Sequence, residues 1–170
     1  MNTIIHDLSD KRFQAAFSQI PSDTAVISDN GTAQSCIGCF GCWIKTPGVC
    51  VLKDGYENMG GLLSRTDRLI IISRCCFGGY SPFVKNMLDR SISYLLPFFQ
   101  TVGGETHHRR RYKKEPTLSV YFYGEAVSPR EIETANELVK ANCRNFYISE
   151  YKTAFYEQPE DFCCEEDFLR

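Results

Sequence analysis

The chain has 170 residues, of which 43% are hydrophobic and 24% charged, and its formal net charge is -2. This length and composition are typical of one globular domain and give no overall bias toward nucleic acid or membranes. Acidic residues within the first ten positions argue against a signal or transit peptide, and no apolar run reaches the roughly 18 residues of a membrane span.

The first half of the chain alternates between strand and helix patterns. Ser9 is a candidate N-cap for the first helix, and the turn Asp29-Asn30-Gly31 ends the second strand. The continuous apolar run at 68–74 predicts a strand buried on both faces of a parallel sheet. The predicted elements are a strand at Thr3–Leu8, a helix from Ser9 to about Gln19, a strand at Thr24–Ser28, a loop at 35–53, a helix from Asp54 to about Ser64 and a strand at Arg68–Arg74.

The second half continues the alternation. Ser-Pro pairs at 81–82 and 128–129 each supply an N-cap followed by a proline at the first helical position. The predicted elements are a helix from Ser81 to about Leu95, a strand at Thr117–Tyr123, a helix from Ser128 to about Asn142, a strand at Asn145–Glu150 and an acidic tail at 158–170.

This alternation predicts a single α/β domain over residues 1–170, with a doubly wound, three-layer parallel sheet. Five strands favour the order 2-1-3-4-5, with Leu69–Ser73 central. Ligands of such sheets bind beyond the carboxyl ends of the strands.

Nine cysteines are unusual for this length. Their odd number and the absence of a secretion signal favour reduced thiols in the cytoplasm over a disulfide framework. Cys75-Cys76 and Cys163-Cys164 are adjacent pairs, and Cys143 stands alone.

Four of the nine form a C-x2-C-x2-C-x7-C motif: Cys36, Cys39, Cys42 and Cys50. Four thiolates from one loop suit a 4Fe–4S cluster or a zinc ion, and the tight spacing favours the cluster. The alternative is a set of reduced thiols without metal. Because this loop and the segment 73–80 both follow strand ends, we expect them at the same edge of the sheet.

The run CIGCFGCW…PGVCVLKDG, followed by RTDRLIIIS and SPFVKNMLDR, resembles the flavodoxin-like NADPH-dependent FMN reductases and the related iron–sulfur flavoproteins. The match covers residues 35 to about 100. The resemblance implies a flavodoxin-like fold, FMN as cofactor, NADPH or NADH as electron donor, and a 4Fe–4S cluster on the four loop cysteines.

The resemblance also places the loop after the third strand against the isoalloxazine ring, through Ser73, Arg74, Cys75, Cys76, Phe77, Gly78, Gly79 and Tyr80. An apolar ring with polar edges needs such aromatic cover and backbone donors. Gly124 and Glu125, after the fourth strand, lie on the ligand side, where Glu125 could contact the ribityl chain. An ordinary strand-to-helix turn and a solvated glutamate are the alternatives.

The turn after the first strand departs from the family. It reads Asp7-Leu8-Ser9-Asp10-Lys11-Arg12, without the glycine of the family's phosphate loop and with acidic residues beside the expected phosphate. Ser9, Lys11 and Arg12 could still hold a phosphate.

The run His107–Lys114 holds five lysines and arginines and two histidines. It reads as a solvated loop, or as a loop near the cofactor cleft or a subunit interface. The negative net charge argues against nucleic acid. The aromatic run Leu95–Phe99 and the helix after Ser81 predict a homodimer or a dimer of dimers, since one domain leaves this apolar surface uncovered.

Three functions follow from these patterns. The first is an FMN-dependent oxidoreductase that transfers electrons between a nicotinamide cofactor or carrier and an acceptor. The second is an electron-transfer or structural protein with a cluster or zinc ion. The third is a family member without FMN that acts as a binding protein. No residue stands out as catalytic, and the acceptor is not encoded in any motif.

Overall fold

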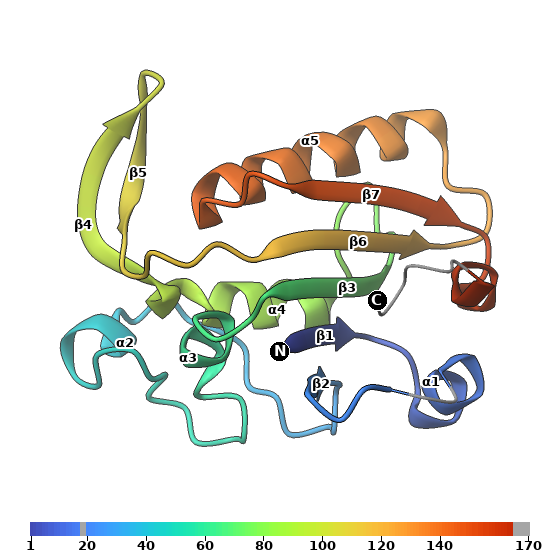
Figure 1. The fold of residues 1–170 in the computed structure, drawn as a ribbon, viewed down its shortest axis with the longest axis horizontal. Helices are drawn as coiled ribbons and strands as arrows, with labels where there is room; N and C mark the ends of the chain where they lie inside the picture. The colour runs from blue at the N-terminus through green and yellow to red at the C-terminus, as the bar shows by residue number, and fades with distance from the viewer. Residues whose placement is uncertain (18–19, 165–170) are drawn as a thin grey trace.

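The computed structural model describes residues 1–17 and 20–164. Its main sheet has five parallel strands in the order β2-β1-β3-β6-β7 (Figure 1). Counted along the chain, this is the predicted order 2-1-3-4-5. The strands are β1 (Asn2–His6), β2 (Thr24–Ile27), β3 (Arg68–Arg74), β6 (Thr117–Tyr123) and β7 (Tyr151–Tyr156).

The apolar run in β3 is central, as predicted. Ile71 pairs with Ile5 of β1 on one side and with Val120 of β6 on the other. Alternate residues along β3 point to opposite faces, so both faces need a cover of apolar side chains. The pattern of the sequence therefore follows from the two-sided burial of this strand.

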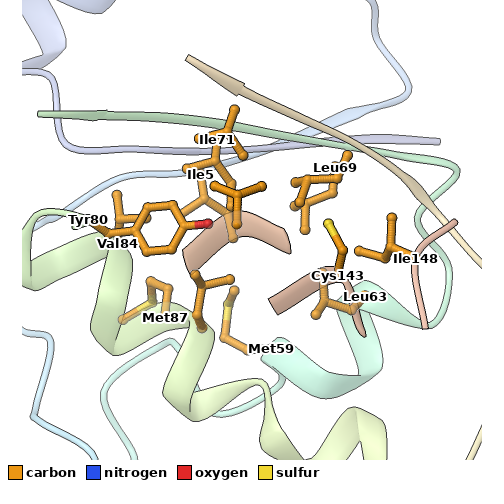
Figure 2. Packing of buried hydrophobic residues seen from close by; sticks show 14 of the residues in the cluster. Ile5, Met59, Leu63, Leu69, Ile71, Tyr80, Val84, Met87, Cys143 and Ile148 are labelled. Carbon is orange, nitrogen blue, oxygen red and sulfur yellow. The ribbon is translucent and has the colours of Figure 1, made fainter. Parts of the chain in front are cut away.

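Three helices cover one face of the sheet: α3 (Met59–Leu63), α4 (Pro82–Arg90) and α5 (Pro129–Phe146). Figure 2 shows Ile5, Leu69 and Ile71 of the sheet facing Val84 and Met87 of α4 and Met59 and Leu63 of α3. Cys143 of α5 lies in this core, and its burial raises the pKa of the thiol to about 11.

The opposite face is covered by α1 (Asp10–Ala16), through Phe13. Ser9 is the N-cap of α1, as predicted, with its Oγ accepting from the Arg12 amide at 3.4 Å. The last residues of the predicted helix, to Gln19, lie outside the described residues, as do residues 165–170 of the predicted tail. The 3-10 turn η2 (Pro159–Cys164) follows β7.

The region after α4 contradicts the predicted long helix. Helix α4 ends at Arg90, a 3-10 turn η1 (Ile92–Tyr94) follows, and the chain then forms an antiparallel hairpin outside the main sheet (Figure 1). Its strands are β4 (Leu95–Val102) and β5 (Glu105–Arg110). Gly103 and Gly104, at φ 58° and 85°, form the two-residue turn that needs positive φ at both positions.

Two further boundaries were predicted wrongly. Helix α5 continues to Phe146, so the last strand begins at Tyr151 rather than at Asn145. The helix predicted from Asp54 is limited to α3, because the preceding residues form hydrogen-bonded turns around the Asp54 carboxylate. Among the described residues, no helix is long and apolar enough to cross a membrane.

Candidate functional site

The carboxyl ends of β3, β6 and β7 surround a cavity of about 550 Å³, here called the polar edge cavity. It is at the edge where parallel sheets bind their ligands. Five of the predicted cofactor residues meet here, because their loops all follow carboxyl ends: Arg12, Arg74, Cys75, Gly124 and Glu125. Glu131 and Glu157 also line it, so acidic side chains outnumber basic ones among the described lining residues.

The turn from β3 to α4 lies beside this cavity. Cys76 and Gly79 exchange two backbone hydrogen bonds of 2.9 Å, and Phe77 and Gly78 take left-handed φ values of 53° and 78°. Phe77 projects into solvent with 95% of its surface exposed. Ser73 is buried and accepts from the Ser81 amide at 2.8 Å, so it fixes the turn rather than facing a ligand.

A second cavity, of about 460 Å³, separates this turn from the cysteine loop; we call it the turn cavity. Its walls include Cys76, Phe77 and Tyr80 from the predicted flavin segment, and Cys36 from the loop. Lys85 and Asn86 of α4 add polar groups. The arrangement offers an aromatic side chain and an apolar wall with a few polar groups, which is the environment that a flat ring system with polar edges requires.

In the turn after β1, the side chains of Asp7 and Arg12 are both hydrogen-bonded to residues of other elements. Asp7 accepts from the Arg74 amide at 2.9 Å and from the Tyr123 hydroxyl at 3.0 Å. Burial, together with the nearby Asp7 carboxylate, raises the pKa of Tyr123. Arg12 donates to Glu160 at 2.8 and 3.0 Å and to Gln158 at 2.6 Å. Lys11 is exposed.

The four loop cysteines line one cavity of about 380 Å³, the thiol cavity, together with Trp43, Arg90 and His108. Burial raises the pKa of Cys42, and the neighbouring thiols add to this shift. The loop leads away from β2 to helix α2 (Gly41–Ile44), which Figure 1 places beyond the amino ends of the strands. Within the described residues, no three histidine, cysteine or acidic side chains are close enough together to hold a metal ion.

The expectation that all four cysteines share an edge with segment 73–80 is therefore wrong for most of the loop. The thiol cavity lies at the carboxyl end of α4, beside Asp89 and Arg90, whereas segment 73–80 precedes the amino end of this helix. Of the residues that the structure describes, only Cys36 and Asp89 line both the thiol cavity and the turn cavity. A loop of this length can cross the side of a sheet, so its later cysteines need not stay at the strand end where the loop begins.

Arg90 is the site residue that the sequence analysis missed. Its side chain is buried, and both terminal nitrogens bind Asp54 of the loop. Among the described residues its Nε has no hydrogen-bond partner, and both Arg90 and Cys50 line the thiol cavity. An arginine on the apolar face of an amphipathic helix was the available signal.

No family model matches the chain, and no curated protein matches it. Solved structures do. An FMN complex of the general stress protein 14 from Treponema denticola superposes with a TM-score of 0.57 at 12% identity, covering 99% of this chain and 96% of that one. The fold is flavodoxin-like.

Two further solved structures agree. An azoreductase from Bacillus anthracis has a TM-score of 0.56 at 10% identity, with 99% and 93% of the two chains covered. An NADPH-quinone reductase from P. pentosaceus has a TM-score of 0.54 at 14% identity, with 98% and 90% covered. At these identities the likeness shows the flavodoxin-like fold and leaves function to the residues themselves.

Proposed function

We propose that the protein is a flavin-dependent oxidoreductase that passes electrons from NADPH, NADH or a reduced carrier to an acceptor. The observation that supports it is the turn cavity beside the carboxyl end of β3, which is lined by Cys76, Phe77 and Tyr80 of the turn together with Cys36 and Asn86. Among proteins of similar fold, one is solved with FMN and another is named an NADPH-quinone reductase.

The residues of the turn cavity fit the isoalloxazine ring of a flavin. Phe77 is free to stack on it, and the exposed Lys85, which pairs with Asp89 at 2.6 Å, has further donors for its polar edge. A bound flavin supplies the hydride and electron chemistry, while the protein holds the ring and excludes competing reactions. The phosphate of FMN fits less well, because Asp7 and Glu160 already bind the donors at the β1 end.

Flavin binding is tested by anaerobic titration of the purified protein with riboflavin and FMN, followed by quenching of flavin fluorescence. We expect Phe77→Ala to weaken binding about three- to tenfold, since a stacked aromatic pair contributes about 0.5–1.5 kcal/mol. Phe98→Ala, on the distant hairpin, is the matched control. Failure of both flavins to bind at high micromolar concentration would contradict the proposal.

A second candidate function is electron transfer by a metal cluster on Cys36, Cys39, Cys42 and Cys50. It is favoured by their shared cavity and by the buried Arg90 guanidinium in the same cavity, which would offset negative charge on thiolates. The thiols would have to converge to bind it, as they would for the zinc ion that is the alternative.

Anaerobic reconstitution with iron and sulfide distinguishes these possibilities. A broad visible absorbance that Cys42→Ser abolishes and Cys76→Ser preserves would support a cluster. Binding of zinc with the same dependence would support a structural ion. A protein that binds neither a cluster nor zinc, and that also fails to bind flavin, would be a non-catalytic binding protein.

We also propose that the chain forms a homodimer and works in the reducing cytoplasm. The first rests on the exposed Phe98 and Phe99 of the hairpin. The second rests on the many unpaired thiols of the described chain.

A further inference from the structure

We propose that Asp7 and Glu160 select against a phosphate, so that this chain takes an unphosphorylated flavin such as riboflavin in preference to FMN. The inference rests on the proposed flavin-binding function and specifies its ligand. Its basis is that two carboxylates of the chain already bind the groups that an incoming phosphate would need.

Asp7 is the first of these carboxylates. It directly follows β1. Its carboxylate accepts from the Arg74 amide at the end of β3 and from the Tyr123 hydroxyl at the end of β6. A phosphate beyond β1 would require free donors at this position. Here the Asp7 carboxylate already accepts from both donors, and its negative charge repels a phosphate, which carries about -1.5 to -2 at neutral pH.

Glu160 is the second. It binds Arg12 through both carboxylate oxygens, at 2.8 and 3.0 Å, and Gln158 adds an amide oxygen at 2.6 Å. The Gln158 amide in turn donates to Glu125 at 3.3 Å. The guanidinium of Arg12 is thus held by η2 and the strand end before it, in the fork-like arrangement that guanidinium groups use for carboxylate or phosphate.

Two backbone amides of this turn are also already bonded. The Arg12 amide donates to the Ser9 hydroxyl oxygen and the Phe13 amide to the Ser9 carbonyl, so neither N–H is free for a phosphate. The turn 7–12 contains no glycine that would let the chain wrap a phosphate. Glu125, Glu131 and Glu157 add negative charge to the polar edge cavity. A ribityl chain ending in a hydroxyl avoids this repulsion and can hydrogen-bond to the same carboxylates.

The experiment compares the Kd values of riboflavin and FMN for the full-length protein and its variants. We expect riboflavin to bind wild type at least as tightly as FMN. Asp7→Asn and Glu160→Gln keep the hydrogen-bonding shape and remove one charge each. Each should lower the ratio of Kd(FMN) to Kd(riboflavin) about tenfold, which corresponds to about 1.4 kcal/mol.

Asp23→Asn is the matched control, because it removes the same charge just before β2, at the opposite edge of the sheet. It should leave the ratio unchanged, since salt screens exposed charges beyond about 10 Å at 0.1 M. Glu160→Gln changes an exposed position, so the test does not depend on a core substitution.

Two results would overturn the inference. Wild type that binds FMN more tightly than riboflavin by tenfold or more, with no response to Asp7→Asn or Glu160→Gln, would refute the selection while keeping the flavin function. Wild type that binds neither flavin would refute the proposed function, and the inference with it.

Discussion

Arg90 brings a positive charge into the protein interior, where the Asp54 carboxylate pairs with it and the Gln34 and Leu52 carbonyls also accept from it. The side chains of Arg90 and Asp54 are 0% and 2% exposed. Hydrogen bonding to Arg90 lowers the pKa of Asp54 below its ordinary value, despite the opposing effect of burial. The pair therefore stabilises the fold at neutral pH, and this contribution declines as the pH falls below about 3.9, the ordinary aspartate pKa, toward the lower folded value.

We predict that Asp54→Asn lowers the free energy of unfolding by about 3–5 kcal/mol at pH 7, since it leaves a buried guanidinium without a counter-charge. Urea denaturation measures it. Asp67→Asn is the control, because Asp67 pairs with Lys114 at 2.8 Å on the surface and should matter far less. Equal losses in the two variants would show that Arg90 is solvated by other means.

His6 provides a second test at the residue scale. It is buried, stacks on Phe13 with ring centroids 3.9 Å apart, and has its pKa lowered by this burial to about 4. The folded state keeps the ring neutral, whereas the unfolded chain protonates it below about pH 6.5. Stability is therefore lost as the pH falls from about 6.5 toward 4.

We predict that wild type loses roughly 2 kcal/mol more unfolding free energy between pH 7 and pH 4.5 than His6→Phe, which retains a stacked ring without a titratable group. The two proteins have all their other titratable groups in common, so the difference between their losses reports on His6 alone. Urea denaturation at both pH values provides the comparison. Parallel losses would mean that the histidine is protonated without cost in the folded state.

At the scale of elements, the hairpin is held by the end of α5. The Tyr147 hydroxyl donates to the His108 carbonyl at 2.6 Å and accepts from Gln100 at 2.5 Å. Arg144 pairs with Glu105 at 2.6 Å, and His107 contacts Asn145 at 2.9 Å. These bonds fix the hairpin against the body of the protein, and with it the His108 wall of the thiol cavity.

We predict that Tyr147→Phe lowers the hydrogen-exchange protection of amides in residues 95–110 about tenfold, because partly buried hydrogen bonds of this kind contribute about 1 kcal/mol. The ring and its cation–π contact with Arg110 remain. Tyr151→Phe, on a half-exposed tyrosine of β7, serves as the comparison and should leave the hairpin unchanged. Full protection in Tyr147→Phe would show that strand pairing alone holds the hairpin.

The main sheet could be predicted from sequence because its signals are local. The two-sided apolar run of β3 and the Ser-Pro caps of α4 and α5 each predict their own element. The hairpin was not predicted, because the helical pattern continues to Leu95 and the basic run at 107–114 reads as a loop, although Gly103-Gly104 between two strand-like runs is a hairpin signal.

In the candidate site, the residues at strand ends could be predicted from the sequence, whereas the long-range ion pairs could not. Arg74, Cys75, Gly124 and Glu125 converge because their strands are parallel. The Arg12–Glu160 and Arg90–Asp54 pairs join residues 148 and 36 positions apart, and no local pattern specifies either partner. The path of the cysteine loop across the side of the sheet is likewise set by tertiary contacts, among them the bond from Trp43 Nε1 to the Leu95 carbonyl at 3.0 Å.

At the scale of the whole molecule, the hairpin leaves apolar side chains exposed to solvent. Phe98 and Phe99 are 62% and 64% exposed, whereas α4 buries Phe83, Val84 and Met87 in the core. The proposed dimer therefore depends on β4 and not on the helix after Ser81. Ring contacts from Phe99 to His108 and from His108 to Trp43 extend this surface to the thiol cavity.

We predict that the protein is a dimer by light scattering at micromolar concentration and that Phe98→Glu with Phe99→Glu makes it monomeric. The two charges would be buried without partners in an interface between copies, at a cost well above that of losing apolar contact alone. Phe77→Glu provides the control, because it makes the same change on an exposed aromatic residue of the β3–α4 turn, outside the hairpin. A dimer that survives the double substitution but not Phe77→Glu would place the interface at the turn, where it would cover the turn cavity. A monomer in wild type would leave the hairpin as a surface for a different protein.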